Sequence, residues 1–340
     1  MKPWLKILIA VSVLTVVTAA VGGVKVLGSG TFHGARVRPL TNQKFERTPA
    51  RLERGKYLVE AVLACNHCHT PLDWTKHDPT MPAGMELAGV DLGTTDIGHL
   101  VIPNITPDPE TGAGKWSDDM LARAIREGIG HDGRALYPLM PYRLFRLLSD
   151  EDVASVVVYL RSLPPARNAL PKTQLTSSVQ SRIQNGPQPL TEPVLAPDLS
   201  TPVKRGAYLV SIIGCAECHT PEDKKGDSIA SMRFGGGLIF NGPWGRVASA
   251  NLTPDASGIP YYNQAMFVRT LRTGYVGARS LNPVMPWWAF RNMTDEDLTA
   301  IYAYLKTLKP VSHRVDNALP ATLCPIDGAM HGGGDQNRKQ

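Results

Sequence analysis

The residues most able to do chemistry are four cysteines that occur as two pairs, each followed at once by a histidine. The first motif spans residues 65–69 and reads Cys-Asn-His-Cys-His, and the second spans residues 215–219 and reads Cys-Ala-Glu-Cys-His. Cys-x-x-Cys-His is the attachment sequence of c-type haem. The two thiols add to the two vinyl groups of the porphyrin, and the adjacent imidazole becomes the fifth ligand of iron. The motifs therefore predict two haem c groups. The attaching thiols are Cys65, Cys68, Cys215 and Cys218, and the axial imidazoles are His69 and His219.

Two other kinds of site also use paired cysteines. A single Cys-x-x-Cys pair is typical of a thioredoxin-like redox centre. Two pairs can bind one zinc ion, but such pairs usually lie about 12–20 residues apart. Here Cys65 and Cys215 are 150 positions apart, and neither alternative explains a histidine directly after both pairs. Haem attachment is therefore the interpretation that we keep.

The two motifs lie inside a longer internal repeat. The matching segments, first copy before second, are 54–59 with 205–210, 104–108 with 251–255, 138–141 with 283–286, and 149–152 with 294–297. Such self-similarity is the signature of a duplicated structural unit. We therefore predict two copies of one haem domain. The predicted division is a leading segment 1–27, domain one 45–165, a proline-rich linker 166–202 that is partly extended, domain two 203–312, and a tail 313–340.

Each copy is predicted to begin and end with a helix. Ser149 and Thr294 are good N-caps, and acidic residues follow each of them in the first turn. Apolar residues then recur at helical spacing. A glycine in each first helix, Gly55 and Gly206, permits close approach of two backbones. We expect the first and last helices of each copy to cross there.

A methionine in each copy is the candidate sixth ligand of iron. Met140 and Met285 both occur in Pro-x-Met-Pro, at matching places in the repeat. A thioether opposite histidine raises the reduction potential of a c-type haem. The flanking prolines restrict the backbone and hold the side chain in a rigid loop. The remaining methionines lack this doubled setting and are interpreted as packing or surface residues.

The Asn-Ile/Leu-Thr-Pro-Asp segments 104–108 and 251–255 have two interpretations. Asn, Pro and Asp favour turns, so the segments can be structural loops. They can also pack against a haem edge or bind a propionate.

Three further features of the sequence have weaker expectations. His67, inside the first motif, is expected to be exposed or near a propionate. Cys324 belongs to neither haem motif, and its thiol can be buried, exposed or bonded to another chain. Residues 331–340 are expected to be disordered.

The N-terminus carries an apolar segment. Lys2 and Lys6 precede 18 uncharged positions, residues 7–24. That length is near the roughly 20 residues that span a bilayer and exceeds the usual signal-peptide core of about 7–15. We expect an uncleaved membrane anchor, with a cleaved signal peptide ending near Ala19 and Ala20 as the alternative. Both alternatives export the haem domains, and the early lysines favour a cytoplasmic N-terminus.

Beyond the haem motifs, the pattern resembles the cytochrome c subunits of membrane-bound alcohol, gluconate and aldehyde dehydrogenases. The residues that carry the resemblance are 104–108, Gly112, Trp116, 126–128, 140–142 and 149–152, and it covers about residues 50–165 and 203–310. It implies a class I cytochrome c fold with His/Met-ligated iron in each half. The fold class that we predict is therefore all-α, with two tandem class I cytochrome c domains, long loops and one preceding N-terminal apolar helix.

The function that follows is electron transfer rather than catalysis, so no catalytic residues are predicted. The chain would pass electrons from a periplasmic dehydrogenase or respiratory donor towards a quinone or oxidase, at the cytoplasmic membrane of a bacterium. The alternative is a dihaem enzyme of the cytochrome c peroxidase or thiosulfate dehydrogenase type, which needs one open iron; a haem-based sensor or scaffold is a third. With a net charge of +6 and no run of Lys or Arg, the chain lacks the footprint of a nucleic-acid-binding protein.

Overall fold

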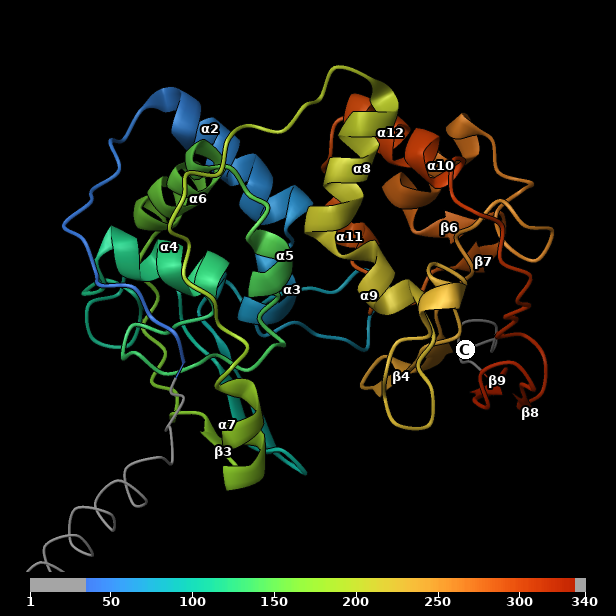
Figure 1. Cartoon of the computed structure of the whole chain (residues 1–340), viewed down its shortest axis with the longest axis horizontal. Coiled ribbons are helices and arrows are strands. Elements are labelled where there is room, and N and C mark those ends of the chain that lie inside the picture. Colours follow the sequence, from blue (N-terminus) through green and yellow to red (C-terminus); the bar gives the residue numbers. More distant parts are fainter. Residues whose placement is uncertain (1–34, 334–340) are drawn as a thin grey trace, which may run out of the picture.

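The computed structural model describes residues 35–333, and its helices follow the repeat. The helices of the first half are α2 (Pro49–Tyr57), the π-helical turn η1 (Leu58–Val62), α3 (Cys65–His69), α4 (Asp118–Glu127), α5 (Tyr142–Phe145) and α6 (Asp150–Ser162). Those of the second half are α8 (Pro202–Ile213), α9 (Cys215–His219), the 3-10 turn η2 (Ala230–Met232), α10 (Gln264–Thr273), α11 (Trp287–Phe290) and α12 (Asp295–Leu305). The two halves lie side by side (Figure 1).

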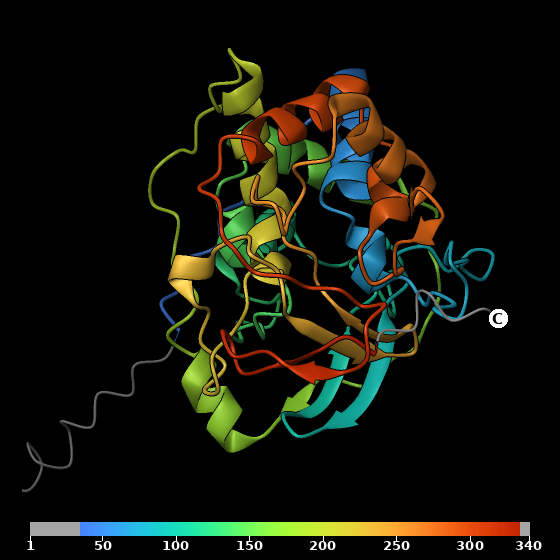
Figure 2. The same cartoon turned by 90° about the vertical axis from the view of Figure 1, so that its right-hand side faces the viewer.

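The prediction of an all-α fold was wrong, because the loops between the helices form small antiparallel sheets. The strands are β1 (Val90–Thr95), β2 (Gly98–Ile102), β3 (Gln174–Leu175), β4 (Ile239–Gly242), β5 (Gly245–Ala248), β6 (Tyr275–Val276), β7 (Arg279–Ser280), β8 (Thr322–Leu323) and β9 (Met330–His331). One sheet has the order β1-β2-β3, and the others are the pairs β4-β5, β6-β7 and β8-β9. Long loops on a compact protein must still pair their backbone N–H and C=O groups, and hairpins do so locally. The β1–β2 hairpin lies at the end of the molecule away from the crossing helices (Figure 2).

The predicted crossing of the first and last helices of each copy is confirmed. Helix α2 packs on α6, and α8 packs on α12. At the crossings a Cβ on Gly55 would lie 2.0 Å from the backbone oxygen of Ser155, and a Cβ on Gly206 would lie 1.9 Å from that of Ala300. No side chain fits at such distances, so the two glycines set the separation of the helix pairs.

The predicted caps of the two last helices are also confirmed. The Ser149 hydroxyl accepts a hydrogen bond of 3.1 Å from the backbone N–H of Asp152, and Thr294 does the same for Asp297 at 3.1 Å. Each cap satisfies a backbone donor that the first helical turn leaves without a partner. The apolar stripe of α6 is buried, as is most of the stripe of α12.

Each half contacts the other through equivalent residues at their boundary. Arg54 and Arg205 bind Asp152 and Asp297 within their own halves. The tyrosine three residues after each arginine crosses over: the Tyr208 hydroxyl donates to Asp152 over 3.2 Å, and the Tyr57 hydroxyl donates to Asp297. Helix α5 packs on α8 and, in the matching way, α11 packs on η1. Such reciprocal pairing is the pattern of an interface with two-fold symmetry.

The segment between the halves is more ordered than an extended linker. Within it, β3 pairs with β2, where Leu175 faces Gly98, and helix α7 (Ser177–Ile183) follows. Val179 and Ile183 of α7 are buried. This part of the chain therefore packs against the first half beside β1 and β2 (Figure 1).

The predicted N-terminal apolar helix lies outside the described residues. Within residues 35–333, none of the helices combines the length and the apolar character that crossing a membrane requires.

Candidate haem sites

The first half encloses a cavity of about 450 Å³, and the four predicted haem residues of that half line it. These residues are Cys65, Cys68, His69 and Met140. Most of the remaining wall is apolar and comes from segments far apart in the sequence, including Leu100, Ile105, Leu121, Phe145, Val156 and Leu160. A porphyrin needs a largely apolar enclosure with a few polar groups at fixed places, and this cavity provides one.

His69 is held in the orientation that an iron ligand requires. It ends α3, is buried, and places its Nδ1 2.8 Å from the backbone oxygen of Pro103. A carbonyl only accepts, so Nδ1 carries the proton and Nε2 keeps its lone pair. Burial lowers the pKa of His69 below its usual value, which keeps the ring neutral. Imidazoles that bind metals typically donate their other N–H in this way.

His219 repeats the arrangement at the end of α9. Its Nδ1 lies 2.7 Å from the backbone oxygen of Ala250, and burial lowers its pKa. The backbone oxygens of the two histidines also make equivalent hydrogen bonds. That of His69 accepts from the N–H of Gly89 at 2.7 Å, and that of His219 accepts from the N–H of Gly236 at 2.8 Å. Both Cys-x-x-Cys-His helices are thus supported by the same contacts.

The two candidate methionines lie in tight turns that lead into a short helix. The backbone N–H of Met140 donates to Tyr137 over 3.1 Å, and that of Met285 donates to Asn282 over 3.0 Å. The following residues, Pro141 and Pro286, are the N-caps of α5 and α11. The turns fix the backbone on both sides of each methionine.

The thiols of the two motifs are protonated, because the surrounding protein raises the pKa of each. Burial raises the pKa of Cys65 and Cys215 to about 12, and that of Cys68 and Cys218 to about 11. Reactive thioredoxin-like cysteines and zinc ligands need a thiolate, which a lowered pKa favours. None of these four cysteines forms a disulfide. The environment therefore fits the edge of an apolar prosthetic group and argues against a reactive thioredoxin-like thiol.

Taken together, the first cavity fits a covalent haem. It combines two thiols, an imidazole with a free Nε2, a thioether and an apolar wall. In the second half the imidazole, the thiols and the methionine turn recur with the same local contacts. The assignment of His69, Met140, His219 and Met285 as axial ligands stays a prediction that this arrangement supports.

The Asn-Ile/Leu-Thr-Pro-Asp segments form structural turns. The Asn104 side-chain oxygen accepts from Thr106, and its amide donates to the backbone oxygen of Ala166 over 2.7 Å. Asn251 does the same with Thr253 and with Val311 at 2.7 Å. These contacts tie each turn to the chain that leaves the last helix. The turn interpretation is confirmed, since both Asn side chains bind protein groups. Ile105 lines the first cavity, so the interpretation that the segment also packs against a haem edge stays a prediction.

Several residues around the sites had no signal in the sequence pattern. Thr173, Leu175 and Ile183 of the inter-half segment line the first cavity. His131 also lines it and stacks on Trp116, with ring centroids 4.3 Å apart. These contacts depend on how distant segments fold together, which local pattern does not encode.

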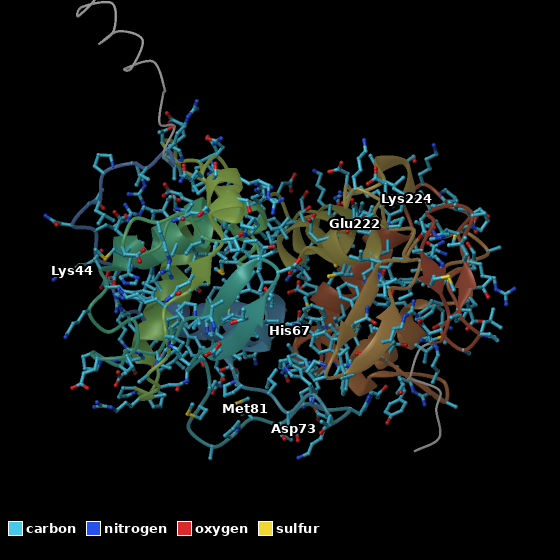
Figure 3. All side chains as sticks on the ribbon, turned by 90° about the horizontal axis from the view of Figure 1, so that it is seen from below. Lys44, His67, Asp73, Met81, Glu222 and Lys224 are labelled. Carbon is cyan, nitrogen blue, oxygen red and sulfur yellow. The ribbon has the colours of Figure 1, made fainter. Side chains whose placement is uncertain are left out.

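His67 lies where the two halves meet, rather than in solvent. Its ring is 5.9 Å from that of Trp288 in a stacked arrangement and 5.0 Å from that of Trp74. Trp74 in turn packs edge-on against Trp244 at 5.2 Å. Figure 3 labels His67 at this boundary. The expectation of an exposed side chain was therefore wrong, because Trp74 and, from the second half, Trp288 pack against the ring. The alternative, a place near a propionate, stays a prediction.

Comparison with known proteins shows which family the chain resembles. The family model described as cytochrome c matches residues 203–309. The chain is 32% identical over 264 residues to a "diheme cytochrome c-type" protein of Cereibacter sphaeroides, covering 73% of this chain and 82% of that one. It is 30% identical to the gluconate 2-dehydrogenase cytochrome c subunit of Pantoea cypripedii, covering 76% of this chain and 60% of that one.

A longer relative matches over only part of its length. A nicotinate dehydrogenase subunit of Pseudomonas putida is 34% identical over 278 residues, which are 76% of this chain but 21% of that protein.

The resemblance noted from the motifs is confirmed by these relatives. The chain belongs to the cytochrome c family.

Proposed function

We propose that the chain is an electron-transfer protein that carries two covalent haem c groups. The observation that carries the proposal is the duplicated histidine geometry, in which Nδ1 of His69 and of His219 is bound to a backbone oxygen. The bound haems supply one-electron redox chemistry. His69 and Met140 would ligate one iron, and His219 and Met285 the other.

A carrier fits better than a dihaem enzyme. An enzyme of the peroxidase or thiosulfate dehydrogenase type needs one iron with an open or unusual axial position. Met140 and Met285 instead occupy equivalent turns, each before a short helix and each hydrogen-bonded through its backbone. Two closed sites suit electron transfer with little rearrangement, so we assign no catalytic residue.

The two halves also meet beside the first attachment helix. His67, which lies between Cys65 and Cys68 in α3, stacks on Trp288 of α11 with ring centroids 5.9 Å apart. We propose that electrons pass between the two haems across this boundary.

The relatives support a dehydrogenase subunit as the electron donor of this chain. Subunits of gluconate and nicotinate dehydrogenases and of quinone-dependent alcohol dehydrogenases are among the proteins that the chain resembles. We propose that it accepts electrons from such a subunit in the periplasm and passes them towards a quinone or an oxidase. Its own N-terminal segment, residues 7–24, would provide the anchor in the cytoplasmic membrane or the export signal.

Near-infrared absorption of the oxidised protein tests the carrier proposal directly, because the iron–thioether bond gives a charge-transfer band in that region. We expect the band at an intensity that corresponds to two Met-ligated haems per chain. Addition of cyanide or carbon monoxide at neutral pH should leave the spectra of both haems largely unchanged. A band for only one haem, with ready ligand binding at the other, would favour the dihaem enzyme instead.

A further inference from the structure

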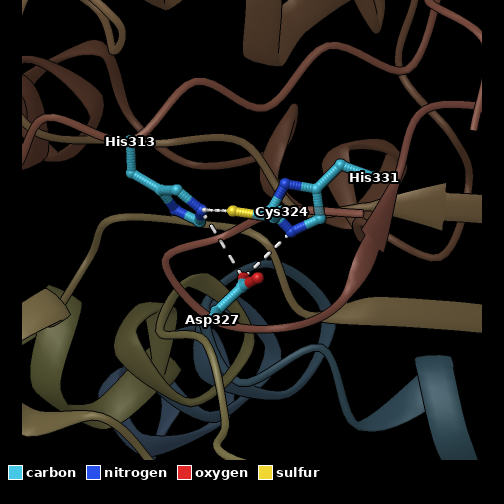
Figure 4. Close-up of side chains that lie close together, drawn as sticks. All are labelled: His313, Cys324, Asp327 and His331. Carbon is cyan, nitrogen blue, oxygen red and sulfur yellow. Dashed lines mark hydrogen bonds and ion pairs between the residues drawn. The ribbon is translucent and has the colours of Figure 1, made fainter. Parts of the chain in front are cut away.

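Four residues of the C-terminal tail gather in one buried cluster. They are His313, Cys324, Asp327 and His331 (Figure 4). Each offers one nitrogen, sulfur or oxygen donor atom, and these four atoms all lie within 4.8 Å of one another. All four residues are buried, and the side chains of His313 and Asp327 are fully so. The sequence pattern left Cys324 unassigned and predicted disorder from residue 331 onwards, so this cluster is a finding of the structure.

The distances fit the edges of a small coordination shell. Nε2 of His313 lies 3.4 Å from Sγ of Cys324 and 3.5 Å from Oδ2 of Asp327, and Nε2 of His331 lies 2.9 Å from the same oxygen. Zinc bonds of roughly 2.0–2.3 Å in a tetrahedron imply donor separations of roughly 3.3–3.8 Å. Small adjustments of the side chains would therefore admit an ion at the centre.

The unused atoms of two of the ligands are already bound to backbone. Nδ1 of His313 lies 3.0 Å from the backbone oxygen of Gly235, so it carries the proton and leaves Nε2 free. Oδ1 of Asp327 accepts from the N–H of Ala329 at 3.0 Å, which leaves Oδ2 facing the cluster. Supporting bonds of this kind orient ligands at metal sites.

A glycine forms one wall of the cluster. Gly237 has φ of +101°, and a Cβ there would lie 2.7 Å from His313, 2.8 Å from Asp327 Oδ2 and 3.0 Å from Nε2 of His331. Any side chain at this position would push three of the four residues apart. The backbone thus leaves the donor atoms free to converge.

Charge balance also favours a divalent ion. Without a metal, the buried cluster holds a carboxylate beside two imidazoles and a thiol, and burying such groups without full pairing is costly. A Zn²⁺ ion bound to one thiolate, one carboxylate and two neutral imidazoles gives a net charge of zero. Four protein ligands leave no open position, which is the arrangement of structural rather than catalytic zinc sites.

We propose that His313, Cys324, Asp327 and His331 bind one structural zinc ion. The ion joins four positions of the tail and so fixes the fold of that segment. The folded tail is held on the β4–β5 hairpin by the Asn317 side chain, which makes two hydrogen bonds, of 2.8 and 2.9 Å, to the backbone of Ala248. The ion also steadies the second haem site. The backbone oxygen of Gly235 accepts from His313, and the N–H of the next residue, Gly236, donates to the backbone oxygen of His219.

Metal analysis of the haem-loaded protein, purified without chelators, tests this proposal. We expect one zinc per chain beside the haem iron, and zinc-edge X-ray absorption with one sulfur and three nitrogen or oxygen neighbours. Cys324→Ser and Asp327→Asn should each reduce bound zinc at least tenfold. Met330→Ala is the matched control, because Met330 is 44% exposed in the same strand as His331, and it should keep the zinc.

A protease experiment tests the structural role separately. Trypsin should cut after Arg314, whose side chain is 75% exposed, faster in Cys324→Ser than in the Met330→Ala control, with the haem content of both unchanged. The proposal is overturned if the purified protein holds no zinc and binds none in a titration with ZnCl₂. Equal zinc in the control and the ligand variants, or copper in its place, would overturn it as well.

Discussion

Replacing Gly55 or Gly206 by alanine should destabilise the protein, although alanine is the better helix former. In an open helix the change would stabilise by about 1 kcal/mol. Here the new methyl group would lie about 2 Å from a backbone oxygen, that of Ser155 or Ala300. The helices must separate to admit it, and overpacking of this kind costs about 1–3 kcal/mol. The sign of the effect is therefore opposite to helix propensity.

Urea unfolding followed by circular dichroism measures this effect. Lys56→Ala, the exposed neighbour on the same helix, is the matched control and should change the unfolding free energy by less than about 0.5 kcal/mol. Both glycine variants should unfold at lower urea concentration than the control. An alanine at either position that raises stability would mean that the helices of that pair do not pack as described.

The second large effect concerns the reduction potentials. Met140→Ala should lower the potential of one haem and Met285→Ala that of the other, because loss of the thioether removes a ligand that favours reduced iron. We expect shifts on the order of 0.1–0.3 V, within the roughly 0.8 V that axial ligands span. Potentiometric titration of each variant, with the near-infrared band as a second measure, separates the two haems.

Met81 offers the control for this experiment. It is 40% exposed and is not among the residues that line the first cavity, and Figure 3 labels it at the surface. Met81→Ala should leave both potentials unchanged. If neither Met140→Ala nor Met285→Ala alters a potential or the near-infrared band, the assignment of the sixth ligands is wrong.

Features repeated in the sequence were predicted best. The caps Ser149 and Thr294 and the glycines of the crossing helices are local or duplicated signals, and each lies where the pattern indicated. Duplication turned weak single-residue evidence into a specific expectation. Duplication also made the haem interpretation of the two Cys-x-x-Cys-His motifs specific, and the contacts that support their histidines recur in both halves.

The sheets were missed although one of them had a signal. Asn241 and Gly242 separate two short apolar runs, and Asn-Gly between such runs favours a hairpin. The structure has the hairpin but places its turn at residues 243–244, so that Asn241 pairs with Arg246 and Gly242 with Gly245.

The tail cluster could not be predicted from spacing. Its residues at 313, 324, 327 and 331 follow none of the Cys-x-x-Cys patterns of familiar zinc sites. They converge because the tail folds back over β4 and β5, where Arg246 donates to the backbone oxygens of Met330 and Gly332. Only the tertiary path of the chain brings the four side chains together.

The number of covalent haems tests the central claim most directly. Intact-mass spectrometry of the protein matured with a c-type haem assembly system should show the chain plus two haem groups that survive acid and organic solvent. Cys68→Ala with Cys65→Ala should remove one group, and Cys215→Ala with Cys218→Ala the other. A matured protein that carries one haem or none, or haem that denaturation extracts, would contradict the account.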